Sequence, residues 1–334
     1  MEASNFDQFG IVFQGCGSYT PKQVLSNENL SEIVDTSNDW IKTRTGISER
    51  RIAQINEDVS EMGFKAALAA IEMACWSLES IDLIILATST PNDLFGSAPN
   101  IQAKLGAKNA VAFDLTAACS GFLFALINAV QYLQNGSYKR AIVIGADQLS
   151  SYVDWKDRRS CILFGDGAGA IAIEASDINN NFYGFKMKTD GQRGSFLNLS
   201  NSKEEKTILN TIKFREGNFS NISMNGQEVY KFAVREVPLI IKELLVTTNF
   251  SACDIDWLLL HQANQRILDA VGERLQIKSN KVLSNLSKYG NTSAATIPLV
   301  LDESVRNKKI KKNDLIATSG FGAGLSWSSA LFRW

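Results

Sequence analysis

The feature that most constrains this fold is an alternation of short, continuous apolar runs with longer helical stretches. The apolar runs are rich in branched residues and cover residues 81–88, 141–146, 169–174 and 257–261. Continuous apolar strands fit a sheet that is covered on both faces. Helical spacing is found between these runs, at residues 59–73, 121–133 and 228–247. This alternation predicts an α/β architecture.

The chain also repeats one pattern along its 334 residues, a length that suits about two domains. Asp82 precedes Cys119 by 37 residues, and Asp256 precedes Asn291 by 35 residues. An apolar run with helical spacing begins shortly after Cys119 and again shortly after Asn291. We therefore expect two similar halves, residues 1–175 and 176–334, that meet across a pseudo-twofold axis. Independent units are the alternative, because all α/β units look alike at this level.

Composition and charge exclude several classes of function. Lys and Arg number 34 against 35 for Asp and Glu, so no global basic field attracts nucleic acid or an anionic membrane. No apolar run reaches the ~18 residues of a membrane helix. Five cysteines without a CxxC pair predict a reducing, cytoplasmic location. The single histidine, His261, argues against a multi-histidine metal site.

Cys119 is the candidate nucleophile. Small residues surround it in the run AACSGF, and an apolar helix begins directly after it. A helix N-terminus offers free N–H groups and a partial positive charge, which favour the thiolate and can hold an oxyanion. A buried structural cysteine is the alternative, because most single cysteines are of that kind.

Two further residues could act with this thiol. His261 ends an apolar strand and precedes a polar turn, where open α/β sheets place site residues. As the only histidine, it alone could serve a thiol as an imidazole partner. Asn291 opens an apolar run in YGNTSAAT and could donate its amide N–H to an oxygen. The residues alone also allow a core histidine and an ordinary Asn N-cap.

Two glycine-rich segments, FGDGAGA at residues 164–170 and GFGAGLSW at 320–327, would let a backbone approach a ligand closely. Neither matches GxxxxGK[ST], and the first leads into a strand rather than a helix, so neither predicts a nucleotide phosphate loop. We interpret both as tight turns packed near a site. Residues 198–222, rich in Asn, Ser, Lys and Glu, predict an exposed excursion.

Taken together, these motifs resemble those of the thiolase-fold condensing enzymes. DWIKTRTGI, AACSGF, FGDGAGA, LLLHQAN, YGNTSAAT and GFGAGLSW occur in that order. The resemblance is strongest to the β-ketoacyl-acyl-carrier-protein synthase III class and covers residues 10–334. It implies a thiolase-like fold, with two pseudo-duplicated βαβ halves in a layered α-β-α-β-α core. Synthases of this fold that use two histidines are excluded by the single histidine.

The resemblance further implies a reaction that initiates fatty acid synthesis. Cys119 would take an acyl group, by default acetyl, from a coenzyme A thioester in a ping-pong mechanism. His261 and Asn291 would hydrogen-bond the malonyl thioester carbonyl and favour decarboxylation, and the carbanion would attack the acyl-cysteine. Backbone N–H groups of Cys119 and Ala323 would form the oxyanion hole. The family commonly has glycine at the position of Ala323, and alanine tolerates positive φ poorly.

Binding residues follow from the same resemblance, and no metal or redox cofactor is expected. The implied coenzyme A contacts are Trp40, Arg44, Arg158, Gly226 and Asn264. Phe321 would lie beside the malonyl group, and Phe95 would limit the acyl pocket from a homodimer interface that includes strand 111–114. The implied acyl-carrier-protein contacts are Arg266 and Gln262, and the patch around Arg266 would extend over Arg274, Lys278 and Lys281.

Three other functions stay open at this level. The chain could be a related condensing enzyme of secondary metabolism, or one primed by longer or branched acyl groups. It could be a cysteine hydrolase, which would also use Cys, His and Asn. It could be a silent, ligand-binding relative. The glycine motifs and the duplication argue against the hydrolase, and the presence of all three site residues argues against the silent relative.

Overall fold

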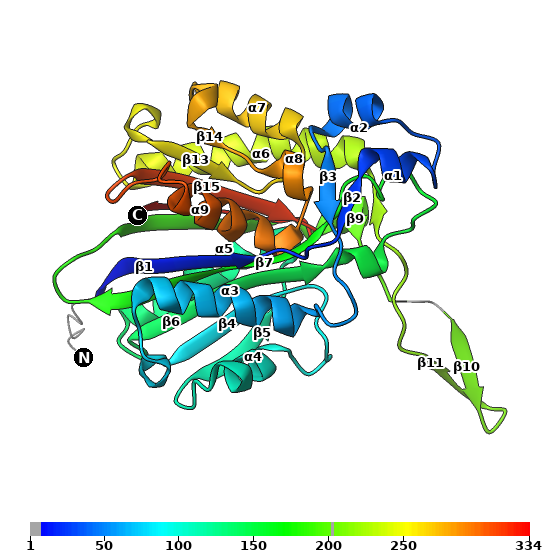
Figure 1. The fold of residues 1–334 in the computed structure, drawn as a ribbon, viewed down its shortest axis with the longest axis horizontal. Helices are drawn as coiled ribbons and strands as arrows, with labels where there is room; N and C mark the ends of the chain where they lie inside the picture. Colours follow the sequence, from blue (N-terminus) through cyan, green and yellow to red (C-terminus); the bar gives the residue numbers. More distant parts are fainter. Residues whose placement is uncertain (1–7, 202–203) are drawn as a thin grey trace.

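The computed structural model describes residues 8–201 and 204–334, and their longer strands form two five-stranded sheets (Figure 1). In spatial order, the first sheet contains β1 (Gly10–Tyr19), β7 (Asp166–Ser176), β6 (Arg140–Gln148), β4 (Leu83–Ala87) and β5 (Val111–Leu115). The second contains β8 (Phe182–Thr189), β16 (Ser326–Arg333), β15 (Leu315–Gly322), β13 (Trp257–Leu260) and β14 (Val282–Leu283).

The two sheets share one topology. In the first, β1–β7 and β7–β6 are antiparallel, whereas β6–β4 and β4–β5 are parallel. In the second, β8–β16 and β16–β15 are antiparallel, whereas β15–β13 and β13–β14 are parallel. The first sheet draws its strands from residues 10–176 and the second from 182–333. This supports the division into halves 1–175 and 176–334, which stays a prediction.

Helices fill and cover the two sheets in five layers. Between the sheets lie α5 (Gly121–Gln134) and α9 (Thr296–Arg306) (Figure 1). The outer faces are covered by α3 (Val59–Ala74) and α4 (Ala98–Leu105) on the first sheet, and by α6 (Gly226–Thr247) and α7 (Gln265–Arg274) on the second. The predicted α-β-α-β-α architecture is confirmed.

The layering explains why the strands read as continuous apolar runs. In β4, Leu83 and Ile85 join the central core with α5, whereas Ile84 and Leu86 join the outer core with α3. Each residue of the strand is therefore buried on one face or the other. The predicted helices at residues 59–73, 121–133 and 228–247 correspond to α3, α5 and α6, with ends shifted by at most two residues.

Smaller elements connect these layers. Beside the body, β2 (Val24–Ser26) pairs with β3 (Glu49–Arg51). The short α-helices are α1 (Asn27–Ser31), α2 (Asn38–Thr45) and α8 (Leu286–Tyr289). The 3-10 helices are η1 (Leu78–Ser80), η2 (Ala118–Ser120), η3 (Leu149–Tyr152), η4 (Gly191–Phe196), η5 (Ala252–Asp254), η6 (Ser279–Lys281) and η7 (Ser293–Ala295). None of the described helices is both long and apolar enough to cross a bilayer.

The glycine-rich segments are strands for most of their length, which corrects the interpretation of the first as a turn, whereas the second contains a turn at residues 323–325 between β15 and β16. Gly167 and Gly169 lie within β7, and Gly320 and Gly322 lie within β15. A Cβ at Gly169 would lie 2.7 Å from the backbone nitrogen of Leu299 in α9. These glycines therefore serve close packing between a strand and its neighbours.

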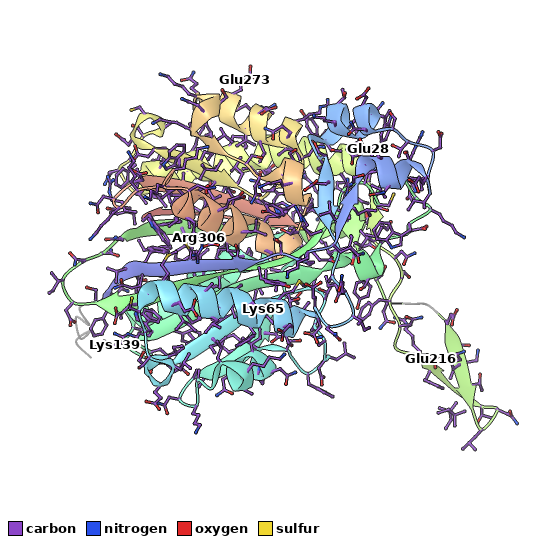
Figure 2. The ribbon with its side chains drawn as sticks, in the orientation of Figure 1. Glu28, Lys65, Lys139, Glu216, Glu273 and Arg306 are labelled. Carbon is purple, nitrogen blue, oxygen red and sulfur yellow. The ribbon has the colours of Figure 1, made fainter. Side chains whose placement is uncertain are left out.

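Residues 197–201 and 204–224 leave the body as a ribbon, which covers the described part of the predicted excursion. At its base, β9 (Leu197–Asn198) pairs with β12 (Ser223–Met224). At its far end, β10 (Glu205–Ile208) pairs with β11 (Ile212–Arg215), and every residue of both strands is exposed. Figure 2 shows Glu216 well away from the body. Residues 1–7 and 202–203 lie outside the described residues, so the predictions that include them are not addressed there.

Candidate active site

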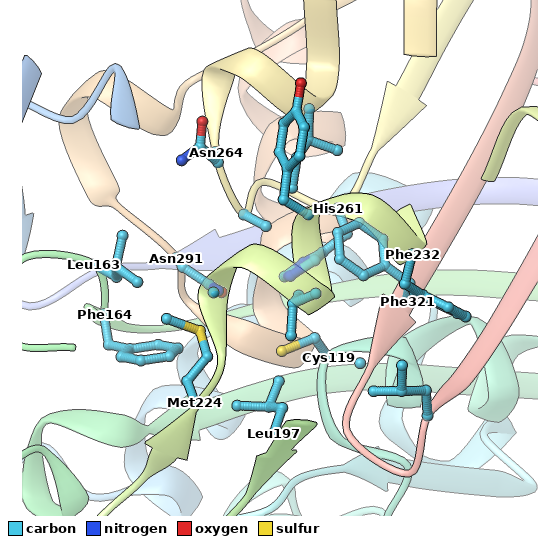
Figure 3. A pocket seen from close by; sticks show the side chains of 17 residues that line it. Cys119, Leu163, Phe164, Leu197, Met224, Phe232, His261, Asn264, Asn291 and Phe321 are labelled. Atoms are coloured by element: carbon cyan, nitrogen blue, oxygen red, sulfur yellow. The ribbon is translucent and has the colours of Figure 1, made fainter. Parts of the chain in front are cut away.

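Cys119, His261 and Asn291 line one pocket although they come from different halves of the chain (Figure 3). All three residues are buried, with exposed fractions of 6%, 1% and 7%. Cys119 follows β5, His261 follows β13, and Asn291 follows β14 and α8. The matching topology of the sheets brings these strand ends together.

Cys119 lies in η2, immediately before α5. The preceding residue, Ala118, has a φ of +48°, a left-handed conformation that turns the chain sharply into the helix. Across from it, a Cβ at Gly322 would lie 2.7 Å from the backbone nitrogen of Cys119. Gly322 is therefore required for this close approach, a role that sequence reasoning missed. The glycine motif that contains it was the available signal.

Burial, rather than the helix end, sets the protonation state of Cys119. Loss of hydration raises the pKa of the thiol to about 12, and hydrogen bonds from Ser293, Asn291 and the backbone only partly oppose this shift. The backbone hydrogen bond lowers the pKa of the thiol, as expected at a helix N-terminus, but burial outweighs it in the ligand-free protein. Cys119 is a neutral thiol there, and it must lose its proton before or during attack.

His261 is a neutral, fixed imidazole. Its Nδ1 lies 2.7 Å from the hydroxyl oxygen of Thr296. The ring of Phe321 meets it edge to face, at a centroid distance of 5.2 Å and an interplanar angle of 80°. Burial lowers the pKa of the imidazole to about 3, because a charged ring would lose its hydration.

Both backbone polar groups of Asn291 are hydrogen-bonded. Its N–H donates to the carbonyl of Leu163 at 2.8 Å, and its carbonyl accepts from the N–H of Gly165 at 3.0 Å. The side-chain Oδ1 accepts from the N–H of Ser293, two residues further along the chain, at 2.8 Å. Because Oδ1 is engaged, Nδ2 is the atom that remains to donate into the pocket. The N-cap of the following 3-10 helix is Thr292, which makes no side-chain cap hydrogen bond, so the interpretation of Asn291 as an N-cap is wrong.

Four of the residues predicted to contact coenzyme A form a cluster that reaches the pocket through Asn264. In α2, the ring of Trp40 lies 4.6 Å from the Arg44 guanidinium and 5.1 Å from that of Arg158. Arg158 donates to the backbone oxygen of Asp35 at 2.6 Å. Asn264 lines the pocket, and its Nδ2 donates to the carbonyl of Arg44 at 3.0 Å. The structure therefore joins this aromatic and cationic cluster to the pocket rim.

Of three other predicted positions, two line the pocket, whereas Ala323 is not among its lining residues. Phe321 and Gly226 both line the pocket, Gly226 as the first residue of α6. Ala323 does not adopt a positive φ, whereas the next residue, Gly324, has a φ of +128°. The alanine is therefore compatible with this turn, and the glycine that the turn requires is present one residue later.

Phe95 and Gln262 lie outside the pocket lining for opposite reasons. Phe95 is 99% exposed beside the exposed Leu94, so it reaches no site within its own chain. Gln262 is fully buried, and its Nε2 donates to the carbonyl of Leu260 at 2.6 Å. A side chain so enclosed cannot contact a carrier protein, and that expectation is wrong. Gln262 instead supports the turn after β13.

The predicted basic patch is only partly continuous. Arg266 is exposed on α7, with its guanidinium 5.5 Å from the centre of the Tyr230 ring. Arg274 and Lys278 are exposed as well, whereas Lys281 is half-buried and donates to the carbonyl of Ile255. Two acidic residues on α7 interrupt the patch, Asp269 and Glu273. Within the predicted basic patch, Arg266 is the residue nearest the pocket, because it lies two residues after the lining residue Asn264.

Comparison with known proteins gives consistent matches. The family profile described as 3-Oxoacyl-[acyl-carrier-protein (ACP)] synthase III matches residues 113–191, and its C-terminal counterpart matches residues 245–334. The chain is 71% identical to a Beta-ketoacyl-[acyl-carrier-protein] synthase III of Prochlorococcus marinus subsp. pastoris, covering 100% of both chains.

Solved structures agree. A 3-oxoacyl-[acyl-carrier-protein] synthase III from Aquifex aeolicus has a TM-score of 0.90 and 42% identity, covering 97% of this chain and 100% of that one. The priming beta-ketosynthase of the R1128 polyketide biosynthetic pathway has a TM-score of 0.91 and 31% identity, covering 100% and 98%.

Proposed function

Because the chain belongs to the 3-oxoacyl-[acyl-carrier-protein] synthase III family, we infer that Cys119, His261 and Asn291 divide the work of two half-reactions. The protein is an acyl-transferring condensing enzyme that initiates fatty acid synthesis. Its substrates are an acyl-coenzyme A and a malonyl-acyl carrier protein. The proposed chemistry uses no metal and no redox cofactor.

In the first half-reaction, the sulfur of Cys119 attacks the thioester carbonyl and coenzyme A leaves. The developing oxyanion is stabilised by the backbone N–H groups of Cys119 and Ala323. The close approach of Gly322 to the Cys119 backbone supports this pairing, because it brings the two segments into contact. The coenzyme A nucleotide lies against Trp40 and Arg158 at the pocket rim.

In the second half-reaction, His261 and Asn291 bind the thioester oxygen of the malonyl group, with Phe321 beside it. Loss of CO2 places negative charge on that oxygen, and each N–H donor contributes on the order of 3 kcal/mol to the transition state. The carbanion then attacks the acyl group on Cys119, and the β-ketoacyl-carrier protein leaves. Acetyl is the proposed primer.

The hydrogen bonds made by Asn291 are the observation that favours a synthase over a cysteine hydrolase. In a hydrolase triad, the Asn would orient the ring by bonding Nδ1 of the histidine. Here that nitrogen pairs with Thr296, and Oδ1 of Asn291 is bound to the N–H of Ser293. Asn291 is therefore free to donate to a substrate oxygen, as decarboxylation requires.

Partners and location are proposed on separate grounds. Arg266 docks the acyl carrier protein, and a second copy binds along β5 and presents its Phe95 to the acyl pocket. Support comes from the exposure of Arg266 and Phe95 and from the position of β5 at a sheet edge. A cytoplasmic location stays a prediction, which rests on five cysteines that are all unpaired.

Separating the half-reactions by mutation tests this function. Cys119→Ala abolishes transfer of a labelled acyl group to the protein and retains part of the malonyl decarboxylation. Asn291→Ala still acylates Cys119 but loses decarboxylation by roughly a hundredfold, as for one oxyanion donor. The assay reads labelled acyl-enzyme on a gel beside CO2 release from malonyl-carrier protein. Loss of acylation with decarboxylation intact in Asn291→Ala would show that Asn291 orients a base, as in a hydrolase.

A further inference from the structure

A buried arginine behind the pocket wall, Arg50 in β3, has no part in the function proposed above. It is among the largest fully buried side chains of the described residues, with an exposed fraction of 0%. Burial lowers the pKa of its guanidinium to about 10, so the group is still a cation at neutral pH. Because a buried charge is costly unless its partners are well placed, the partners of Arg50 show what this charge is used for.

The guanidinium of Arg50 donates to neutral oxygen atoms in three segments of the chain. Nη1 donates to the carbonyl of Leu25 in β2 at 3.0 Å. Nη1 and Nη2 share Oδ1 of Asn27 in α1, at 3.0 and 2.9 Å. Nη2 also donates to the carbonyl of Ile162 at 2.8 Å. The fork is thus anchored on β2 and α1 and reaches from there to Ile162, which a single ammonium group could not do.

Ile162 begins the segment that holds the backbone of Asn291. The carbonyl of Leu163 accepts from the N–H of Asn291 at 2.8 Å, and the N–H of Gly165 donates to the Asn291 carbonyl at 3.0 Å. Between them, Phe164 forms a parallel β-bridge with Asn291. Leu163 and Phe164 lie beside Asn291 in the pocket wall (Figure 3). The direction of the Asn291 carboxamide therefore depends on where this segment lies.

The stem of Arg50 packs against both chains of that bridge. A Cβ at Gly165 would lie 3.1 Å from the Cβ of Arg50, and a Cβ at Gly290 would lie 3.4 Å from it. Gly290 directly precedes Asn291 and has a φ of +63°. The stem and Nη2 of Arg50 therefore support the two segments that together hold Asn291.

We propose that Arg50 is a positioning residue that fixes residues 162–165 against Asn291, so that Nδ2 of Asn291 points at the malonyl thioester oxygen. This inference rests on the proposed function and deepens its second half-reaction, in which Nδ2 donates to that oxygen. Arg50 lies outside the pocket lining, so it acts through the backbone and does not touch a substrate. Acylation of Cys119 does not use Asn291, and it should therefore depend little on Arg50.

Replacement of the fork by a single ammonium tests this role. Arg50→Lys keeps the positive charge but cannot hold Asn27 and Ile162 together. We expect R50K to release CO2 from malonyl-carrier protein roughly tenfold more slowly, as for an oxyanion donor that is misplaced rather than removed. Acyl-Cys119 should form from acyl-coenzyme A at nearly the wild-type rate. Equal losses in the two half-reactions, or no loss of decarboxylation, would overturn the proposal.

Arg333→Lys is the matched control for this exchange. Arg333 is also an arginine of a strand, β16, and it donates to the carbonyl of Asn313 and to the hydroxyl of Tyr183. None of these three residues lines the pocket. R333K should therefore leave both half-reactions unchanged, and a selective loss of decarboxylation in it equal to that in R50K would contradict a specific role for Arg50.

A double-mutant cycle with Asn291→Ala separates positioning from a general structural role. If Arg50 acts through Asn291, R50K should slow decarboxylation much less in the N291A background than in the wild type, because the carboxamide that it positions is already absent. A loss of the same size in both backgrounds would show that Arg50 acts by another route and would overturn the proposal.

A second variant keeps the test decisive if R50K does not fold. In R50K/N27D, the new carboxylate neutralises the buried ammonium and holds it away from Ile162, so the same selective loss of decarboxylation is expected. A wild-type rate of decarboxylation in this variant would overturn the proposal. Failure of the proposed function is recognised separately, in N291A alone: normal decarboxylation there would refute that function, whereas a loss in N291A without one in R50K would refute only the role of Arg50.

Discussion

At the scale of single residues, burial determines how the site groups are charged. Cys119 and His261 lie in one pocket, and both are neutral because neither is hydrated enough to hold a charge. Loss of hydration is the largest cause of both pKa shifts, upward for the thiol and downward for the imidazole. The reaction must therefore move protons between neutral partners.

The buried imidazole makes the stability of the protein depend on pH. The pKa of His261 is about 3 in the folded protein and 6.5 in an unfolded chain, so acid protonates the unfolded chain first. The stabilisation is complete above the unfolded value and is lost as pH falls from 6.5 toward about 3. Between pH 8 and 5, this histidine accounts for a loss of about 2 kcal/mol in the free energy of unfolding.

Urea unfolding of the wild type and His261→Gln at pH 8 and 5 measures this contribution. Glutamine cannot take up a proton in this range, so the variant should lose less stability on acidification. Equal losses in the two proteins would contradict a buried neutral imidazole.

At the scale of elements, α7 divides its residues between the core and a surface near the pocket. Ile267, Leu268 and Val271 are buried against the second sheet, whereas Arg266 projects outward. The exposed carboxylates of Asp269 and Glu273 on the same helix reduce the positive electrostatic potential around Arg266. A single cation at the pocket rim, rather than a broad basic patch, is therefore the element that can attract an acidic carrier protein.

Reversal of that charge tests the docking role. Arg266→Glu should raise the apparent KM for malonyl-carrier protein severalfold and leave acylation by acyl-coenzyme A unchanged, with a smaller effect at high salt. Lys139→Glu is the matched control, because Lys139 is exposed at the far end of the molecule (Figure 2). Equal loss in both half-reactions, or the same effect from the control, would make Arg266 an ordinary solvated residue.

At the scale of the whole molecule, one edge of the first sheet is open. β5 is the last strand of the first sheet, and among the described strands it pairs only with β4. Its first residue, Val111, is 48% exposed, and Leu94 and Phe95 are more exposed still. An open edge beside exposed apolar side chains is a surface suited to a second copy of this chain.

Sedimentation tests this association. At micromolar concentration, the protein should sediment with twice its chain mass of 36.7 kDa. Val111→Lys should shift it toward the monomer, because a charge at an unpaired edge opposes strand pairing. Ile178→Lys is the control, since Ile178 is 90% exposed and lies outside this edge. A wild-type monomer, or equal dissociation in both variants, would refute the interface at β5.

The sequence by itself predicted an α/β fold with strands covered on both faces, and it named Cys119, His261 and Asn291 as the candidate reacting groups. Continuous apolar runs such as residues 83–87 can be satisfied only with cover on both faces, and each motif carries its chemistry locally. Tertiary structure alone decided the burial of Gln262, the closeness of Gly322 to Cys119 and the contact of Thr296 with His261. It also decided that the Cys119 thiol and the His261 imidazole are neutral, because their loss of hydration depends on neighbours that are distant along the chain.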